Sequence, residues 1–530
     1  MSERFDAIVI GSGFGGSIVA CRLAEKGMRV LVLERGRRWT PADYPRKPGD
    51  AWIYDVRHPE KQNGWLDLRF FKRMMVAQAA GVGGGSLAYS SVHLEAPPAL
   101  FAQGWPAELT YAELKPHYDT VAKVLNLQTL PDGQLSERLK LAREAATKLG
   151  HADRFSKAPL AVSFSPEWNY ELEDPFDSRR SKAFINAQGE QQGTCIHLGN
   201  CDIGCDVRAK NGLDVTYLAA AEQRGCDVRP LHVVRRIEPG DGWYRVEFDR
   251  IEHKQRVRGE ETATRVFVAA GSLGSTELLL RARDEYKTLP NLSPALGQRW
   301  SPNANVLSLA GYPDGDRVRQ SVGPTITSVI DFMDGSAGGE RFVIEDDGFP
   351  SLLLNAVRAS MGASGDGDDM GGDLGRSLFE RLEEAVLGKD ATRGLMLWLG
   401  AGVDAGDGEL RLDRSWVPPF RQTMELDWSP DGSKGVIESI LGLHRQMSEA
   451  TGGHPGSGLG WRVFRSLLTL HPLGGCRMAS TADSGVVNHL GQVFGYPHLY
   501  VVDGAIVPTP IGRNPSHTIA ALAERIAAHV

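Results

Sequence analysis

The first 34 residues set a strand, a glycine-rich turn, a helix and a second strand in immediate succession. Phe5 to Ile10 is a short apolar run, Ser17 to Lys26 has helical spacing, and Arg29 to Leu33 is apolar again. In the turn Gly11-Ser-Gly-Phe-Gly-Gly16, the first glycine permits a tight bend, the second lets backbone amides approach phosphates, and the last lets helix pack on strand. The helix N-terminus then offers N–H groups to an anion. The pattern predicts a dinucleotide-binding βαβ unit; the alternative is a glycine turn in an unrelated βα unit.

An acidic residue follows the second strand. Glu34 stands about twenty residues after Gly11, where a carboxylate can accept hydrogen bonds from ribose hydroxyls. A 2′-phosphate would face this negative charge, so the position argues against a phosphorylated ribose.

Composition limits the function classes. With 530 residues and 42% hydrophobic content, the chain can bury a large core, and we expect two interleaved domains. The 59 basic and 66 acidic residues give a net charge of −7, which excludes a polyanion-binding signature, so nucleic acid is not an expected partner. No leader pattern precedes the first strand and no run is long enough for a membrane span, so we expect a cytoplasmic protein. Six cysteines do not indicate a disulfide scaffold.

Two later segments place glycines where backbone would lie against a ligand. The first is Ala80-Gly-Val-Gly-Gly-Gly-Ser86, for which the alternative is a flexible turn. The second is Ala270-Gly-Ser-Leu-Gly-Ser-Thr276, which joins a predicted strand at Val266 to Ala269 to a predicted helix at Glu277 to Arg283. Further strands are predicted at Leu231 to Val234 and Tyr244 to Phe248, and helical spacing extends over residues 110–150.

The last 230 residues have a mixed pattern before a distinctive end. Glycine and aspartate dominate Gly362 to Gly375, and a helix is predicted at Leu378 to Val386, with an apolar stripe that faces either the core or a lid or membrane surface. The chain closes with a strand at Leu499 to Val502 and an amphipathic helix at Thr518 to Ile526.

Four blocks resemble the glucose–methanol–choline (GMC) oxidoreductases, and within them the FAD-dependent cholesterol oxidase branch. They are Gly11 to Gly16 with Glu34, Gly81-Val-Gly-Gly-Gly-Ser-Leu87, Gly271 to Arg283 continuing to Ser301-Pro-Asn-Ala-Asn305, and His471-Pro-Leu-Gly-Gly to the C-terminus. Because the blocks span both ends and the middle of the chain, the resemblance covers the whole architecture.

The resemblance implies an α/β fold with a discontinuous Rossmann-type FAD-binding domain interleaved with an α+β substrate domain on a mostly antiparallel sheet. We assign residues 1–40, 76–92, 205–312 and 466–530 to the FAD-binding domain. Residues 41–75, 93–204 and 313–465 form the expected substrate-binding domain.

The motifs and the resemblance together assign the FAD contacts. They are Gly11, Gly13, Phe14, Gly16, Glu34, Arg35, Gly81, Gly83, Gly84, Gly85, Ser86, Tyr89, Val234, Ala270, Gly271, Asp503, Gly504, Asn514, Pro515 and Thr518. Where cholesterol oxidases read Gly-Ser-Leu-Val-Asn-Gly-Gly, this chain has Tyr89 in place of the asparagine. Some family members attach their flavin through a histidine at or near this position, and its absence argues for non-covalent FAD.

The resemblance also implies hydride transfer from an alcohol carbon to flavin N5, with His471 and Asn514 as catalytic residues. A histidine can take or share the alcohol proton near neutral pH, and an asparagine amide can donate to the same oxygen. Without the resemblance, His471 would be interpreted as a turn residue. We interpret His517 as a helix-start or packing residue, although related enzymes with two histidines keep it in view.

Glu345 is a further candidate. In cholesterol oxidases a cavity glutamate moves a proton during steroid isomerisation, and Glu345 lies five residues before a matching proline at Pro350. Its neighbours Asp346 and Asp347 equally suit an ordinary surface acid.

Three cysteines form the most open motif. Cys195, Cys201 and Cys205 have a ferredoxin-like spacing with Leu198 in place of one cysteine, and similar spacing is found in FAD-dependent glucose dehydrogenases that carry an iron–sulfur cluster. Against a cluster, Asp206 stands where ferredoxins usually have proline. We expect packed or surface thiols, with no bound metal.

The expected function is therefore FAD-dependent oxidation of a bulky, largely apolar alcohol, sterol- or steroid-like, with oxygen or another electron acceptor. The alternatives are a sugar or aryl-alcohol dehydrogenase that passes electrons to a carrier, a hydroxynitrile lyase that keeps FAD without redox change, and a regulatory or structural FAD-binding protein. The sequence does not choose between acceptors or fix the oligomeric state.

Overall fold

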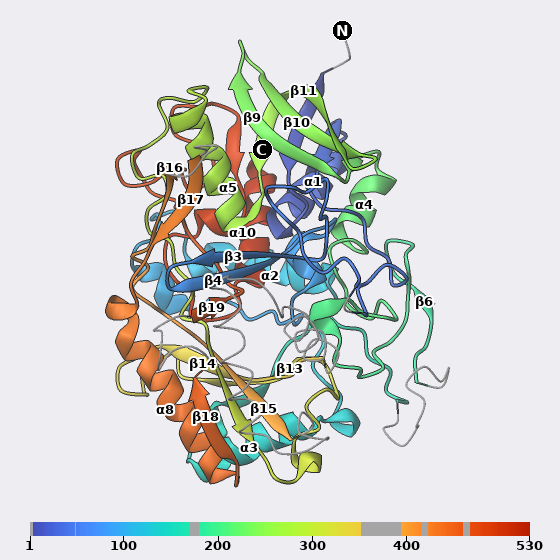
Figure 1. Cartoon of the computed structure of the whole chain (residues 1–530), viewed down its shortest axis with the longest axis vertical. Helices are drawn as coiled ribbons and strands as arrows, with labels where there is room; N and C mark the ends of the chain where they lie inside the picture. The colour runs from blue at the N-terminus through green and yellow to red at the C-terminus, as the bar shows by residue number, and fades with distance from the viewer. Residues whose placement is uncertain (1–3, 48, 169–179, 351–393, 415–421, 459–466) are drawn as a thin grey trace, which may run out of the picture.

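The computed structural model describes residues 4–47, 49–168, 180–350, 394–414, 422–458 and 467–530. Two large sheets stand one above the other, with the seven-stranded sheet in the upper part of Figure 1 and the six-stranded sheet in the lower part. The turns at Gly362 to Gly375 and the helix expected at Leu378 to Val386 lie outside the described residues.

The upper sheet has the predicted Rossmann-like order. Five strands run parallel in the order β8-β2-β1-β11-β20, and β10 and β9 continue from β11 as an antiparallel meander. The strands are β1 (Phe5–Ile10), β2 (Val30–Leu33), β8 (Asp227–Arg229), β9 (His232–Pro239), β10 (Tyr244–Glu252), β11 (Gln255–Val268) and β20 (Leu499–Val501). All six strands expected in these regions are confirmed. β11 begins earlier than predicted because its first half is an exposed polar arm that carries no apolar signal.

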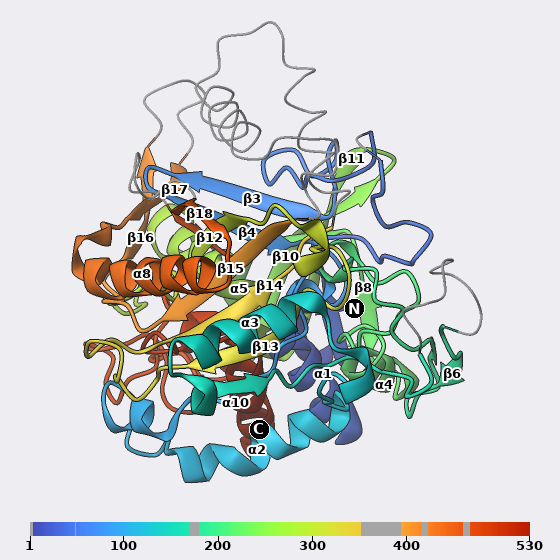
Figure 2. The same cartoon turned by 90° about the horizontal axis from the view of Figure 1, so that it is seen from below.

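Helices from both ends of the chain pack together beneath this sheet. Figure 2 shows α10 (Ser516–His529) beside α2 (Tyr111–Val124) and α1 (Phe14–Glu25). Buried Glu524 of α10 accepts hydrogen bonds from the Arg22 guanidinium, at 2.8 Å to each carboxylate oxygen, and from the Tyr217 hydroxyl of α4 (Tyr217–Gln223) at 2.6 Å. This partly buried ion pair fixes the C-terminal helix against the first βαβ unit.

The lower sheet is antiparallel throughout, as expected for the substrate domain. Its order is β18-β12-β15-β14-β13-β5. The strands are β5 (Phe155–Lys157), β12 (Val306–Gly311), β13 (Ile326–Asp331), β14 (Phe342–Asp347), β15 (Leu395–Gly402) and β18 (His454–Gly458). Helices α3 (Glu137–Lys148) and α8 (Lys434–Ala450) cover one face, which leaves the other face toward the upper sheet.

A narrow ribbon lies between the two sheets (Figure 1). It consists of β3 (Leu66–Phe71), β4 (Met74–Ala79) and β19 (Leu467–Thr469), with β19 parallel to β4. The hairpin of β3 and β4 was not predicted, since its segment carries no clear periodicity. The ribbon matters for the site because β19 leads directly into His471.

The other β-strands and the other α-helix of the described residues complete the fold. They are β6 (Phe184–Ile185), β7 (Gln191–Gln192), β16 (Glu409–Arg414), β17 (Gln422–Asp427) and α5 (Gly271–Leu280). Within the described ranges, no helix has the length and apolar character needed to cross a membrane.

Candidate active site

One continuous cavity of about 2160 Å³ runs between the two sheets. Most of the predicted FAD contacts line it, namely Gly11, Gly13, Phe14, Glu34, Arg35, Gly84, Gly85, Tyr89, Val234, Ala270, Gly271, Asp503, Gly504, Asn514 and Pro515. Gly16, Gly81, Gly83, Ser86 and Thr518 are not among the residues that line it. His471 also lines the cavity, as do Ile326 and several leucines of the lower sheet.

The glycine turn after β1 is shaped to receive a phosphate. A Cβ on Gly13 would meet no described atom within 4 Å, so the backbone there faces open space. By contrast, a Cβ on Gly15 would come within 1.8 Å of the Val502 carbonyl oxygen, and one on Gly16 within 2.0 Å of the Gly11 carbonyl oxygen. Close packing therefore requires two of the glycines, while Gly13 leaves room for a ligand at the start of α1. These residues fit the pyrophosphate of FAD.

The part of the cavity around the glycine turn is called the nucleotide half here, and the part around His471 and the lower sheet is called the alcohol half. Two carboxylates in the nucleotide half accept hydrogen bonds from protein donors. Glu34 accepts hydrogen bonds from the Ser12 amide at 3.0 Å and hydroxyl at 2.6 Å on one oxygen, and from the Gly36 amide at 2.9 Å on the other. Asp503 accepts from the Gly271 amide at 2.8 Å, the Ala505 amide at 2.8 Å and the Ser275 hydroxyl. Burial raises the pKa of Asp503. Both acids therefore fix the loops that surround the nucleotide half of the cavity.

His471 has a defined tautomer. The Asn305 carbonyl oxygen accepts from the Leu470 amide at 3.2 Å, and a backbone N–H can only donate, so the Asn305 amide nitrogen is the atom that faces His471. It donates to His471 Nδ1 at 2.9 Å. Burial lowers the pKa of His471 to about 4, so the ring is neutral at physiological pH. This hydrogen-bond network places the single ring proton on Nε2, and His471 is a donor.

Glu345 is wholly buried and hydrogen-bonded to Asn514. The Asn514 amide nitrogen donates to Glu345 Oε2 at 3.2 Å, while Glu345 Oε1 and Asn514 Oδ1 have no partner among the described residues. Burial, opposed by the Asn514 hydrogen bond, raises the pKa of Glu345 to about 8. The interpretation of Glu345 as a surface acid is wrong, because the β14 register places it in the sheet interior opposite Leu399, which lines the cavity.

Comparison with known proteins identifies the family. Residues 460–523 match the GMC oxidoreductase family model, and residues 9–50 match an NAD(P)-binding Rossmann-like domain. A cholesterol oxidase from Acinetobacter baumannii is 31% identical over 99% of this chain and 94% of its own length. The chain is a GMC oxidoreductase. Within the family it resembles the cholesterol oxidase branch, since a cholesterol oxidase from Mycobacterium tuberculosis is 30% identical over 99% of this chain and 91% of that protein.

The fold agrees with this membership. The crystal structure of pyridoxine 4-oxidase from Mesorbium loti superposes with a TM-score of 0.66 at 16% identity and covers 99% of both chains. As a GMC oxidoreductase, the protein is an FAD-dependent enzyme that acts on alcohol CH–OH groups.

The segment Ser301–Asn305 positions both catalytic candidates of this GMC enzyme, a role that the sequence did not reveal. Asn303 accepts from the Ile511 and Gly512 amides at 3.0 and 2.8 Å and donates to the Arg513 carbonyl oxygen at 2.8 Å. Asn305, two residues later, holds His471. The segment Ser301–Asn305 thus connects the loops that carry His471 and Asn514. Both asparagines belong to the Ser301–Asn305 block of the family resemblance, but their hydrogen-bond partners are remote in sequence, so their role could not be predicted.

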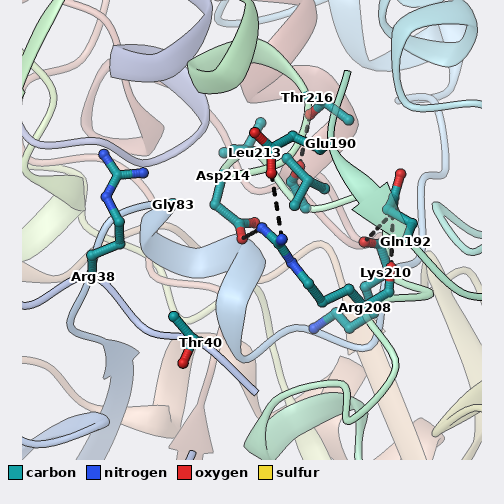
Figure 3. A network of polar contacts seen from close by, with 12 residues as sticks. Arg38, Thr40, Gly83, Glu190, Gln192, Arg208, Lys210, Leu213, Asp214 and Thr216 are labelled. Carbon is teal, nitrogen blue, oxygen red and sulfur yellow. Dashed lines mark hydrogen bonds and ion pairs between the residues drawn. The ribbon is translucent and has the colours of Figure 1, made fainter. Parts of the chain in front are cut away.

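Behind the cavity wall, a polar network holds the glycine cluster. The Ser86 hydroxyl donates to the Gly83 carbonyl oxygen at 2.8 Å and accepts from the Leu213 amide at 3.0 Å. Figure 3 shows this region, with Gly83, Leu213, Asp214 and Lys210 labelled. Buried Lys210 donates to the carbonyl oxygens of Leu87, Tyr89 and Cys201 at 3.0, 2.8 and 2.7 Å. The network explains why Gly83 and Ser86 support the wall without lining it.

His517 points away from the cavity. Its ring nitrogens lie 3.2 and 3.0 Å from the carbonyl oxygens of His93 and Tyr118, in keeping with the expected packing role. Thr518 likewise contacts the Tyr118 hydroxyl at 2.8 Å. Tyr89 does line the cavity, and its hydroxyl lies 3.2 Å from His93 Nε2.

The three clustered cysteines lie in hydrogen-bonded loops. The His197 amide donates to the Cys195 sulfur at 3.4 Å, and the Ala209 amide donates to the Cys205 sulfur at 3.1 Å. Burial raises the pKa of Cys195 and Cys201, which keeps these thiols protonated. In the part of the chain that the structure describes, no three His, Cys, Asp or Glu side chains are arranged to hold a metal ion.

Proposed function

We propose that the protein oxidises a bulky, largely apolar secondary alcohol, of the sterol or steroid kind, to its carbonyl. The relatives named as cholesterol oxidases support this substrate class. So does the wall of the alcohol half of the cavity, which is lined by Leu309, Ile326, Phe349, Leu395, Leu397 and Leu399. Such a wall favours a large hydrocarbon skeleton. The observation that carries the proposal is the pairing of Glu345 with Asn514 beside this apolar wall.

Non-covalent FAD is part of the proposal. Bound FAD supplies the acceptor for the hydride that leaves the carbinol carbon. The open backbone at Gly13 fits the cofactor. So do Glu34 and Asp503, whose carboxylates already accept hydrogen bonds from protein donors and hold the surrounding loops in place. Position 89 holds a tyrosine whose hydroxyl contacts His93, and this supports a cofactor without a covalent link through that position.

Three side chains have separate proposed roles at the substrate oxygen. Glu345 Oε1, which lacks a partner among the described residues, accepts the hydroxyl proton. His471 Nε2–H donates to the same oxygen and stabilises the negative charge that develops as the proton leaves. Asn514 holds the other Glu345 oxygen and so fixes the direction of the free one. His471 is assigned the donor role because Asn305 occupies its only basic nitrogen.

Molecular oxygen is the proposed electron acceptor, on the strength of the relatives named as oxidases. All six cysteines are free, which supports the proposed cytoplasmic location.

An anaerobic titration tests the proposal. Sterols, sugars and aryl alcohols are added separately to the FAD-loaded enzyme, and flavin absorbance near 450 nm is followed before and after admission of air. We expect sterols to bleach the flavin and air to restore it. Bleaching by sugars or aryl alcohols alone would overturn the substrate class. Persistent bleaching in air would overturn oxygen as acceptor, and turnover without bleaching would indicate a lyase.

A further inference from the structure

An acid interrupts the apolar wall of the alcohol half. Asp347 is the last residue of β14 and lines the cavity. Its side chain is only 8% exposed, and its Oδ1 atom has no hydrogen-bond partner within the described ranges. A buried oxygen left unpaired costs free energy unless a ligand supplies the partner.

The β14 register puts Asp347 on the same face as the catalytic candidate. Glu345 lies two residues earlier, and alternate residues of a strand share a face, about 6.6 Å apart. The residues opposite Asp347 on the neighbouring strands are Ile326 and Leu397, and both line the cavity. Glu345 and Asp347 therefore share one face of β14, with apolar residues opposite them; Asp347 lines the cavity, and Glu345 is not among the lining residues.

The surroundings of Asp347 favour a neutral carboxyl group. Burial, then the charges of Asp202 and Glu345, raise the pKa of Asp347, with the Arg138 guanidinium opposing them. Asp202 lines the same part of the cavity and accepts from the Ser90 hydroxyl at 3.2 Å. A neutral carboxyl can both donate and accept, which suits an uncharged hydroxyl group better than a cation.

We propose that Asp347 forms a second polar subsite, which binds a hydroxyl group of the substrate other than the one that is oxidised. The inference rests on the proposed function and narrows it from bulky alcohols to diols. The two hydroxyls are separated by about the spacing of alternate strand residues. A steroid with one hydroxyl on its first ring and another on the second or third ring has this arrangement. A site built to bond a hydroxyl discriminates strongly against the analogue that lacks it.

Matched substrates test the subsite. The kcat/KM values are measured for 3-hydroxysteroids that differ only by one extra hydroxyl on the second or third ring. We expect the preferred diol to exceed its mono-alcohol by about 100-fold in the native enzyme, as for a buried polar partner left unpaired. In Asp347→Leu the preference falls to within about threefold, and in Asp347→Asn, which keeps a polar group of the same shape, it stays intermediate. FAD content and the melting temperature of each variant establish that it is folded.

The outcomes separate this inference from the proposed function. Equal kcat/KM values for diols and mono-alcohols in the native enzyme, or an unchanged ratio in Asp347→Leu, would overturn the subsite while sterol oxidation stands. If no steroid reduces the flavin, the proposed function fails. Equilibrium binding, measured by the shift of the oxidised-flavin spectrum, then decides whether the subsite exists. Diol binding at least tenfold tighter than mono-alcohol binding, with the difference lost in Asp347→Leu, supports the subsite. Equal binding of the two steroids refutes it. If Asp347→Leu does not fold, the Asp347→Asn ratio decides alone.

Discussion

The two halves of the cavity treat their polar groups in opposite ways. In the nucleotide half, both oxygens of Glu34 and of Asp503 accept hydrogen bonds from the protein. In the alcohol half, one oxygen each of Glu345, Asp347 and Asn514 lacks any partner in the described structure. The first arrangement makes a rigid cradle before its ligand arrives. The second keeps acceptors free for a hydroxyl group, at a cost in stability that functional sites commonly carry.

The same contrast appears in the way each half is built. In the nucleotide half, the carboxylates of Glu34 and Asp503 accept hydrogen bonds from backbone amides of glycine-rich turns, and Asp503 reaches Gly271 from 232 residues away. The alcohol half depends on Ser301–Asn305, which connects the loops of His471 and Asn514 across more than 150 residues of sequence. Changes in the alcohol half should therefore alter the chemistry and leave cofactor binding intact, and changes in the nucleotide half should do the reverse.

Replacing the proposed base should produce the largest effect. Glu345→Gln keeps the shape and the Asn514 contact but cannot take a proton, so we expect flavin reduction by substrate to slow by about 10²–10⁴-fold. Stopped-flow absorbance under anaerobic conditions measures the rate, and the protein-to-flavin absorbance ratio verifies that FAD stays bound. A rate within threefold of the native enzyme would remove Glu345 from the mechanism.

The pH dependence should report the same group. The pKa of Glu345 is about 8 and only its ionised form accepts a proton, so kcat/KM should rise with pH, by about 100-fold from pH 6 to the plateau above pH 8. His471, with a pKa of about 4, remains a neutral donor over this range. The ascending limb should disappear in Glu345→Gln. A bell-shaped profile with a limb near pH 6.5 would instead indicate a titrating histidine.

Inverting the tautomer of His471 should cost less. In Asn305→Asp a carboxylate faces Nδ1 and draws the ring proton there, so Nε2 can no longer donate to the substrate oxygen. We expect flavin reduction to slow by about 10–100-fold, the range found when a partner that orients a functional histidine is lost. Asn303→Asp serves as the comparison variant, because it keeps the acceptor for the Ile511 and Gly512 amides, loses the donor to the Arg513 carbonyl oxygen, and does not touch His471. Equal losses in the two variants would argue for a general disturbance of the segment.

How much the sequence predicted follows the same division. The strands around Gly11 and the amphipathic C-terminal helix were predictable, because periodicity and glycine spacing are local signals. The antiparallel second sheet was expected only from the family resemblance, since the pattern of its segment is mixed. The burial of Glu345 was not, since its acidic neighbours resemble a surface run and only the pairing of β14 with β15 reveals the interior position. The partners of Asn303 and Asn305 were equally hidden, because side-chain hydrogen bonds between distant loops leave no periodic trace.

The smallest effect on chemistry should come from the cradle. Gly13→Ala adds a methyl group into open space, so the apo-protein should keep its stability while FAD affinity falls by about tenfold, because the backbone can no longer approach the phosphate. Once saturated with FAD, this variant should be reduced at close to the native rate. Gly15→Ala is the contrasting variant, since its methyl group collides with the Val502 carbonyl oxygen and should lower the melting temperature of the apo-protein itself. Fluorescence titration with FAD and thermal unfolding of the apo-proteins measure the two effects. A Gly13→Ala protein that binds FAD normally would mean that the phosphates do not rest on this turn, and that the nucleotide half is not the cradle its geometry indicates.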